Sequence, residues 1–283
     1  MKRRTFLQNS VLAVAGSLTL PSILANAKGN TSIGLQLYTL RDVIMKDVKG
    51  TLRAVASMGY THVETYGYKD GVLFGMPAAE FAKYLKSLGV KVTSGHYGID
   101  MATGSGWEKA CADAKEMGQE YIVVPWMDKK FYSSLDVLKG TCNSINKAAE
   151  VAKKYNLRMG YHNHAFEFSE VEGKSVYDAM LENLDPKLVA MEMDLYWVVN
   201  AGKDPLKYFE KYPGRFELWH VKDMDKAKRD NNADVGTGSI DFKALFANAK
   251  QSGMKHFFME QETYPSSPME STKKSIDYLK TIL

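Results

Sequence analysis

The chain has 283 residues, of which 45% are apolar, and its formal net charge is +4. This length is ample for one large hydrophobic core or two modest ones. The only two cysteines, Cys111 and Cys142, lack metal-ligand spacing, so a disulfide-rich scaffold is excluded, while pairing between these two stays open.

The first 27 residues are typical of an export signal rather than of a folded segment. Three basic residues at 2–4 precede the apolar run "VLAVAGSLTL", and the small residues of 25–27 form a cleavage site. The order "RRTFL" is typical of a twin-arginine signal. A membrane anchor is the weaker alternative, because the run is too short to cross about 30 Å of hydrocarbon. We expect export to the periplasm, cleavage near Ala27 and no stable membrane insertion.

Loss of this segment would also remove most of the positive charge. It contains three basic residues and no acid, so the formal charge would fall from +4 to +1. A nearly neutral protein offers no basic face for nucleic acid or for an anionic membrane. We therefore expect no nucleic-acid partner.

From Ser32 onward, short β-rich runs alternate with amphipathic helical runs. The expected strands cover residues 32–39, 61–67, 90–96, 121–126, 157–164, 188–194, 215–222 and 255–262. In the helical run 48–59, Leu52, Val55 and Ala56 follow the spacing of one helix face, and Gly59 is placed as a C-cap. The other expected helices cover residues 78–90, 107–118, 142–156 and 271–283.

This alternation predicts βαβ units and a parallel sheet. Eight units in about 250 residues match a closed (β/α)8 TIM barrel, which we expect to form a single domain over residues 28–283. A doubly wound open sheet is the alternative, but "LYTLRDV" after the first strand has no G-x-G-x-x-G. The longest segment without predicted structure is 223–241, and a loop of this length in a compact barrel is usually functional.

Polar residues gather at the C-terminal ends of the expected strands, where such barrels carry their chemistry. These residues are Gln36, Tyr38, Glu64, Tyr66, His96, His162, His164, Glu167, Glu192, Asp194, His220, Lys222, Asp223, Glu260 and Glu262. Residues two apart on a strand face the same side, so several of these acids and bases should converge in pairs.

Converging buried carboxylates need a cation, because unpaired charge is costly to bury. Ligation by Asp, Glu and His together suits Mn²⁺, Co²⁺, Zn²⁺ or Fe²⁺ better than Ca²⁺. Taken singly, His220 could be a core histidine, and Glu192 could pair with Arg158 or Lys222. Taken together, the residues favour a metal site.

Over essentially the whole mature length, the chain resembles the xylose isomerase-like family of sugar phosphate isomerases and epimerases, in the endonuclease IV-like superfamily. The segments that carry the resemblance are "GLQLYTLR", "GYTHVETYG", "GYHNHAFEF", "MEMDLYWVVNAG", "WHVKDMD", "VGTGSIDF" and "FFMEQE". The resemblance implies a TIM barrel that binds one divalent metal ion, most often Mn²⁺, with Co²⁺, Zn²⁺, Fe²⁺ or Mg²⁺ as alternatives.

By this resemblance, Asp194, His220 and Glu260 match three of the four usual metal ligands. Many members have a glutamate ligand in an "ENH" motif, where this chain has "HNH". The match places His162 at that position, and Glu167 is a competing candidate five residues later. We assign His162 as the fourth ligand and Glu167 as a catalytic base.

The resemblance further implies a sugar isomerase or epimerase that removes a proton next to a metal-bound carbonyl. The candidate catalytic residues are Glu167, Glu260, His96 and Lys222. The candidate substrate-binding residues are Gln36, Tyr38, Glu64, Trp126, His164 and Trp197. Aromatic rings can stack on sugar C–H surfaces, and the candidates are Trp126, Trp197, Trp219, Tyr38 and Tyr66. Core packing is the alternative for about half of them.

The expected partner is a small-molecule carbohydrate. Export, and the lack of a P-loop or arginine cluster, favour a neutral sugar or keto-glycoside over a sugar phosphate. A keto-glycoside lyase or hydratase is a close alternative, because it starts with the same proton abstraction. A non-catalytic periplasmic sugar-binding protein is a third reading. With six histidines and a nearly neutral charge, a three-zinc nuclease is disfavoured. A homo-oligomer is left open.

Overall fold

A computed structural model describes residues 32–283, so the predicted export signal over residues 1–27 lies outside the described residues. Eight strands form one sheet in which every pairing is parallel. They are β1 (Gly34–Gln36), β2 (His62–Thr65), β5 (Lys91–Gly95), β6 (Tyr121–Val124), β7 (Arg158–His162), β10 (Val189–Asp194), β11 (Leu218–Val221) and β14 (His256–Met259). Each lies within its predicted range.

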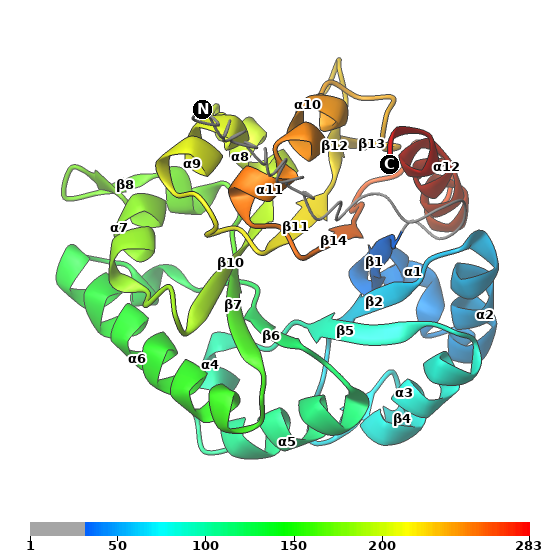
Figure 1. Ribbon diagram of the computed structural model, residues 1–283, viewed down its shortest axis with the longest axis horizontal. Coiled ribbons are helices and arrows are strands. Elements are labelled where there is room, and N and C mark those ends of the chain that lie inside the picture. Colours follow the sequence, from blue (N-terminus) through cyan, green and yellow to red (C-terminus); the bar gives the residue numbers. More distant parts are fainter. Residues whose placement is uncertain (1–31) are drawn as a thin grey trace, which may run out of the picture. The chain divides into compact units, whose positions relative to one another are not determined.

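The sheet curves into a nearly closed barrel (Figure 1). Its strand order is β5-β2-β1-β14-β11-β10-β7-β6, and the two end strands are joined by a parallel bridge between His96 and Val123. The Tyr97 N–H donates to the Val123 carbonyl over 2.8 Å, and the Glu120 N–H donates to the Thr93 carbonyl over 2.8 Å. The predicted single-domain TIM barrel is confirmed, and the open doubly wound sheet is excluded.

Helices surround the strands (Figure 1). The longer ones are α2 (Val48–Met58), α3 (Ala78–Ser87), α5 (Trp107–Met117), α6 (Leu135–Lys154), α7 (Val176–Asn183), α9 (Pro205–Lys211) and α12 (Pro268–Ile282). The shorter ones are η1 (Leu37–Leu40), α1 (Arg41–Ile44), α4 (Ile99–Ala102), η2 (Lys129–Phe131), η3 (Phe166–Phe168), α8 (Leu195–Asn200), α10 (Phe242–Ala247) and α11 (Ala249–Ser252).

The structure confirms one helix end predicted from sequence and corrects one helix start. Helix α2 ends at Gly59, whose φ of 98° is the left-handed C-cap conformation. Helix α6 begins at Leu135, well before the predicted residue 142, because the Ser134 hydroxyl accepts a hydrogen bond from the Val137 N–H as an N-cap.

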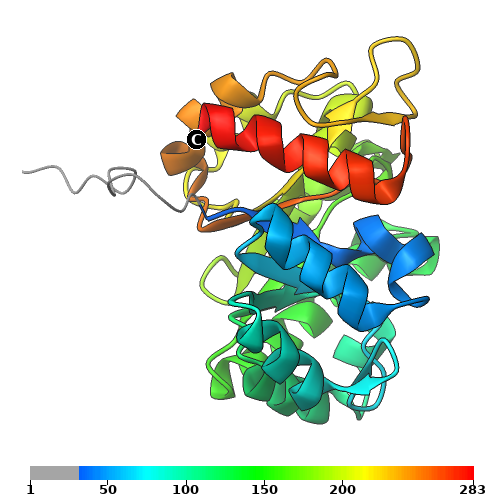
Figure 2. The ribbon, with the colours of Figure 1, turned by 90° about the vertical axis from the view of Figure 1, so that its right-hand side faces the viewer.

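Helix α12 lies beside helix α2 (Figure 2). This contact connects the two ends of the described chain. The Tyr60 hydroxyl donates to the Thr272 carbonyl over 2.9 Å, and Lys280 Nζ donates to the Met58 carbonyl over 2.7 Å. Both cysteines are free and buried. Among residues 32–283, no helix has the length and apolarity that crossing a membrane would require.

Inside the barrel, an apolar layer separates two polar zones. The layer consists of Tyr121, Val123, Ala190, Leu218 and Phe258. Towards the N-terminal strand ends, the Tyr121 hydroxyl donates to Glu217 over 2.9 Å, and Arg158 donates to the same carboxylate over 2.6 Å. The candidate site occupies the other side of the layer, at the C-terminal strand ends.

Three hairpins lie outside the barrel sheet: β3 (Val72–Leu73) with β4 (Met76–Pro77), β8 (Glu170–Val171) with β9 (Lys174–Ser175), and β12 (Asp223–Met224) with β13 (Asn232–Ala233). The last one corrects the prediction that 223–241 lacks structure. The Asp223 carboxylate accepts hydrogen bonds from the backbone N–H groups of Met224, Gly236, Gly238 and Ile240 at 2.8 to 3.1 Å. A buried carboxylate thus fixes this segment.

Candidate active site

Acidic and histidine side chains from six barrel strands, or from the residue just after a strand, meet inside the C-terminal end of the barrel. Strand register brings them together, because Glu192 lies opposite His162 in the β10–β7 pairing and Asp194 lies opposite His220 in the β10–β11 pairing. Two overlapping groups result, and His220 belongs to both.

The first group consists of Asp194, His220 and Glu260, whose potential ligand atoms all lie within 4.8 Å of one another. His220 Nδ1 lies 3.0 Å from Glu260 Oε2 and 3.9 Å from Asp194 Oδ2. Lys222 Nζ lies 3.0 Å from Asp194 Oδ2 and 2.9 Å from Glu260 Oε2, and it also contacts Glu262. All three members of the group are buried, and Asp194 Oδ2 accepts no well-aligned hydrogen bond.

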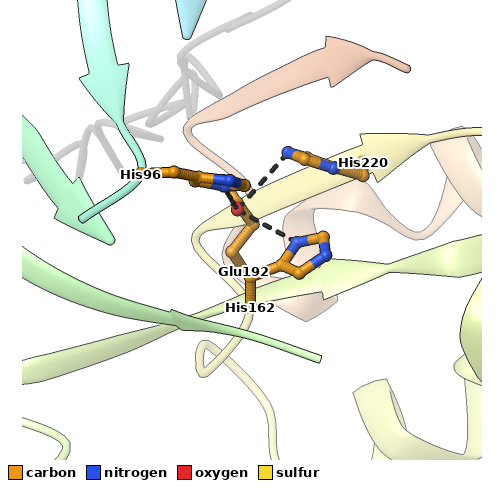
Figure 3. A group of neighbouring side chains, drawn as sticks. All are labelled: His96, His162, Glu192 and His220. Carbon is orange, nitrogen blue, oxygen red and sulfur yellow. Dashed lines mark hydrogen bonds and ion pairs between the residues drawn. The ribbon is translucent and has the colours of Figure 1, made fainter. Parts of the chain in front are cut away.

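The second group consists of His96, His162, Glu192 and His220. Three imidazole rings surround the carboxylate of Glu192 (Figure 3). Its Oε2 atom lies 2.9 Å from His96 Nε2, 3.1 Å from His162 Nδ1 and 3.3 Å from His220 Nε2. The alternative in which Glu192 pairs with Arg158 or Lys222 is excluded, since Arg158 pairs with Glu217 and Lys222 with Asp194, Glu260 and Glu262.

Glu64 belongs to this same network. Its carboxylate oxygens lie 3.0 Å from His220 Nε2 and 3.2 Å from His96 Nε2, and the residue is completely buried. The carboxylate of Glu64, a predicted substrate-binding residue, thus lies against the histidines, and its contact with a substrate stays a prediction.

Burial and charge both act on the ionisation of these groups. Burial raises the pKa of Asp194 to about 6, although the Lys222 ammonium opposes this shift. Burial and the nearby Glu64 carboxylate raise the pKa of Glu192 to about 7. Burial alone would lower the pKa of His96, but Glu64 and Glu192 outweigh it and raise that pKa to about 9. The site concentrates carboxylates that gain from a bound cation.

The donor set fits a divalent ion. Asp194 and Glu260 offer carboxylate oxygens and His220 offers Nδ1, which is the mixed oxygen and nitrogen ligation of Mn²⁺, Zn²⁺ or Fe²⁺ sites. The predicted fourth ligand, His162, lies in the second group, and its Nε2 is 3.9 Å from Asp194 Oδ2. Asp194, His220 and Glu260 are therefore the residues that the structure groups for an ion, and His162 as a fourth ligand stays a prediction.

The structure places Glu167 outside both groups of potential ligands. Its carboxylate accepts hydrogen bonds from the Tyr161 hydroxyl and the His164 N–H, both over 2.8 Å. Tyr161 belongs to the core between strands and helices, outside the barrel interior. Burial raises the pKa of Glu167 to about 8.

Aromatic residues occupy the rim around the predicted site. Tyr38 is 39% exposed and Trp126 is 48% exposed. The His164 ring lies 5.6 Å from Trp197 and stacks on Phe166 at 5.9 Å, and Phe166 in turn lies 6.4 Å from Trp126. Consecutive ring contacts therefore connect the histidines of the site with the half-exposed Trp126 side chain.

Two further predicted residues are buried. Gln36 caps the Tyr38 N–H through its side-chain oxygen over 3.0 Å, and its amide nitrogen is 3.5 Å from His96 Nδ1. Trp219 is completely buried and stacks on Phe209 with centroids 5.0 Å apart, so it serves core packing rather than the rim.

Glu192 is the central residue of the second group, and the sequence assigned it no catalytic, substrate-binding or metal-binding role. Its convergence was predicted, because it stands two positions before Asp194 on one strand and must face the same side. Glu262, which contacts the Lys222 ammonium, likewise received no role, although the same alternation pairs it with Glu260.

The fold and this cluster define an enzyme of the TIM-barrel class with an acidic, histidine-rich site at its C-terminal face. The chain belongs to the xylose isomerase-like TIM barrel family, whose model matches residues 52–282. This confirms the resemblance seen in the sequence motifs.

Several known proteins are similar to this chain. A sugar phosphate isomerase/epimerase from Parabacteroides distasonis ATCC 8503 is 30% identical, with a TM-score of 0.79 over 89% of this chain and 98% of that one. An inosose dehydratase from Clostridium perfringens is 25% identical over 181 residues, which make up 57% of this chain and 60% of the relative. The match thus spans about three-fifths of that relative's length.

A more distant structure adds evidence on the fold alone. It is that of the IolI protein with a bound zinc atom, which is 12% identical and has a TM-score of 0.69 over 89% of this chain and 98% of that one.

Proposed function

We propose that this protein is a divalent-metal-dependent enzyme that isomerises or epimerises a neutral sugar by removing a proton next to its carbonyl. The observation that carries this proposal is the convergence of Asp194, His220 and Glu260, with Lys222 beside them, at the end of the barrel where the aromatic rim lies. Family membership and the similar sugar phosphate isomerase/epimerase support the reaction class.

The cofactor proposed is one divalent ion, with Mn²⁺ preferred and Zn²⁺, Co²⁺, Fe²⁺ or Mg²⁺ as alternatives. A bound ion would supply Lewis-acid polarisation of the substrate carbonyl. The bound zinc of IolI supports a metal in a barrel of this fold. The export signal predicted over residues 1–27 makes the periplasm the proposed compartment, where a neutral sugar is a better candidate than a sugar phosphate.

Proton transfer is assigned to Glu260 and Lys222. Burial would raise the pKa of Glu260, but Lys222 and His220 lower it well below its usual range. Glu260 is therefore ionised at neutral pH, as a base must be. Burial would lower the pKa of Lys222, but three carboxylates raise it well above its usual range, so Lys222 is a charged donor that can hydrogen-bond a developing oxyanion. His96, which lies against the Glu64 and Glu192 carboxylates, is a second donor.

Elimination on the same site is the second candidate, either as a dehydration or as cleavage of a keto-glycoside. Curated relatives of this chain include inosose dehydratases, and His162 stands where the resemblance expects a second glutamate. One carboxylate base together with a protonated donor such as Lys222 suffices to remove a proton and expel an oxygen.

The test is to incubate the purified protein with keto-sugars, inososes and 3-keto-glycosides, with Mn²⁺ or with a chelator, and to follow products by mass spectrometry. Isomerisation conserves mass, whereas dehydration loses water and glycoside cleavage splits the molecule. Conversion with conserved mass that the chelator abolishes supports the first candidate. Sugar binding that survives the chelator, without conversion of any substrate, would instead indicate a binding protein.

A further inference from the structure

We propose that Glu192 is a positioning residue that fixes the tautomers of His162 and His220, so that each ring presents its other nitrogen to the metal ion. This inference rests on the proposed function, because it concerns the metal site described there. It gives a role to a buried carboxylate that neither binds the ion nor touches the substrate.

The geometry around Glu192 is that of one acceptor shared by several donors. Its Oε2 atom lies 3.1 Å from His162 Nδ1, 3.3 Å from His220 Nε2 and 2.9 Å from His96 Nε2 (Figure 3). Its Oε1 atom has no partner within the described residues, and Glu192 is completely buried. The carboxylate is therefore directed at the rings alone.

A neutral imidazole carries one N–H, and a carboxylate oxygen can only accept. The nitrogen that faces Glu192 must then carry the proton, and the opposite nitrogen keeps its lone pair. For His162 this leaves Nε2, which is 3.9 Å from Asp194 Oδ2. For His220 it leaves Nδ1, which is 3.0 Å from Glu260 Oε2.

Glu64 reinforces the assignment for His220. His220 Nε2 lies 3.0 Å from Glu64 Oε1 as well as 3.3 Å from Glu192 Oε2, so two carboxylates compete for a proton on that nitrogen. On the other side of the ring, a second proton on Nδ1 can bridge to the Glu260 carboxylate when no ion is bound. A bound cation would take the place of that proton and leave the one on Nε2, and carboxylates behind metal-binding histidines act in this way in other proteins.

The competing arrangement would use Glu192 itself as a ligand, together with the inner nitrogens of His96, His162 and His220. The donor sets decide against it. The group of Asp194, His220 and Glu260 offers two carboxylates, whereas the competing group offers only one. Asp194 Oδ2 is buried without a hydrogen-bond partner among the described residues, as expected of an atom that gains from a bound cation.

The first experiment measures the affinity of Mn²⁺ and Zn²⁺ by isothermal titration in wild type, Glu192→Gln, Glu192→Asp and Glu217→Gln. The amide that Glu192→Gln introduces can donate towards a ring and so select the wrong tautomer, and we expect affinity to fall by about 10- to 100-fold. Glu192→Asp, which keeps an acceptor, should recover part of the loss. Glu217→Gln removes a carboxylate beyond the apolar layer and should bind like wild type.

The second experiment reads the tautomers directly in wild type, by long-range ¹H–¹⁵N spectra of protein labelled at histidine. With zinc bound, the protons should reside on Nδ1 of His162 and on Nε2 of His220. In the metal-free protein His162 should keep its proton on Nδ1. Protons on the opposite nitrogens, with zinc on the inner ones, would overturn the proposal even if the Glu192 variants do not fold.

The outcomes separate this inference from the proposed function. A wild-type protein that binds no divalent ion contradicts the proposed function, while the tautomer of His162 still tests the role of Glu192. A wild type and a Glu192→Gln variant that bind metal equally well contradict the positioning role and leave the proposed function standing.

Discussion

Lys222 donates a 2.9 Å hydrogen bond to Glu260 deep inside the barrel, where the lysine side chain is completely buried. Its ammonium also lies 3.0 Å from Asp194 Oδ2, so it neutralises the same two carboxylates that would bind a metal ion. Lys222 and the proposed ion would therefore interact with the same two carboxylates.

Replacement of Lys222 by Met should therefore destabilise the metal-free protein. Loss of one member of a buried ion cluster leaves carboxylates unpaired, at a cost of about 3–5 kcal/mol. Calorimetry should show a lower melting temperature for the metal-free variant and a larger rise on addition of Mn²⁺ than in wild type. Equal melting temperatures of the two metal-free proteins would contradict the ion-pair role.

Removal of a predicted ligand should abolish both bound metal and turnover. We expect His220→Ala and Glu260→Ala to lose tightly bound ion after dialysis, as measured by plasma mass spectrometry, and to lose at least about 100-fold in kcat/KM, since metal and base act together. Glu262→Gln, whose side chain is partly exposed, is the matched control and should retain the ion. Full metal content and full activity in both alanine variants would show that the site is misassigned.

Glu167 should control how stability depends on pH. Its folded pKa of about 8 lies above the ordinary 4.5, so the folded protein holds a proton that the unfolded chain has lost between these values. Stability should fall as pH rises from 4.5 to 8, by a few kcal/mol, on the order of 1.4 kcal/mol per pKa unit. Glu167→Gln removes this dependence, because an amide does not ionise.

Urea unfolding of wild type and Glu167→Gln at pH 5.5 and pH 8.5 measures this effect. The variant should gain stability relative to wild type at the higher pH. If wild type and variant differ in unfolding free energy by the same amount at both pH values, the buried Glu167 carboxyl is ionised in the folded protein at both. Because both oxygens of Glu167 already accept hydrogen bonds away from the ligand groups, we also expect Glu167→Gln to retain most activity.

Asp223→Asn should loosen the segment that follows β11. The carboxylate accepts four backbone hydrogen bonds, and hydrogen bonds to a charged acceptor contribute about 1.5–3 kcal/mol each. An amide can accept only at its oxygen, so hydrogen exchange at Gly236, Gly238 and Ile240 should accelerate at least about tenfold, since a loss of 1.4 kcal/mol corresponds to that factor. Unchanged exchange at these amides would exclude the anchoring role.

Two tryptophans should separate substrate binding from packing. Trp126 is half exposed at the rim, so Trp126→Ala should raise KM with little change in melting temperature. Trp219 is completely buried, so Trp219→Ala should cost about 3–5 kcal/mol of folding stability. A Trp126→Ala variant with unchanged KM for every substrate converted would remove this residue from the binding site.

The fold could be predicted because each barrel strand is a short apolar or β-branched run followed by a helix with its own cap. Alternation also placed Asp194, His220 and Glu260 on the inner face. It could not identify the partners of Glu192, because these come from three other strands and depend on how the barrel closes.

Closeness in sequence was a poor guide where the chain changes direction. Glu167 follows His162 by five residues, but the intervening turn carries it to Tyr161, whose side chain faces the outer core. Trp219 likewise neighbours His220, and strand alternation sends it to the opposite face. In both places the direction of the side chain mattered more than the distance along the chain.

The apolar layer inside the barrel also separates a stabilising end from a chemical end. It consists of Tyr121, Val123, Ala190, Leu218 and Phe258. On one side, Arg158, Glu217 and Tyr121 tie strand ends together, and on the other side the carboxylates and histidines are held for chemistry. Because this layer separates the two polar zones, substitutions at the C-terminal strand ends can accumulate without disturbing the charged groups at the N-terminal strand ends. The reaction catalysed at the C-terminal end can therefore change while the contacts that stabilise the N-terminal end are kept.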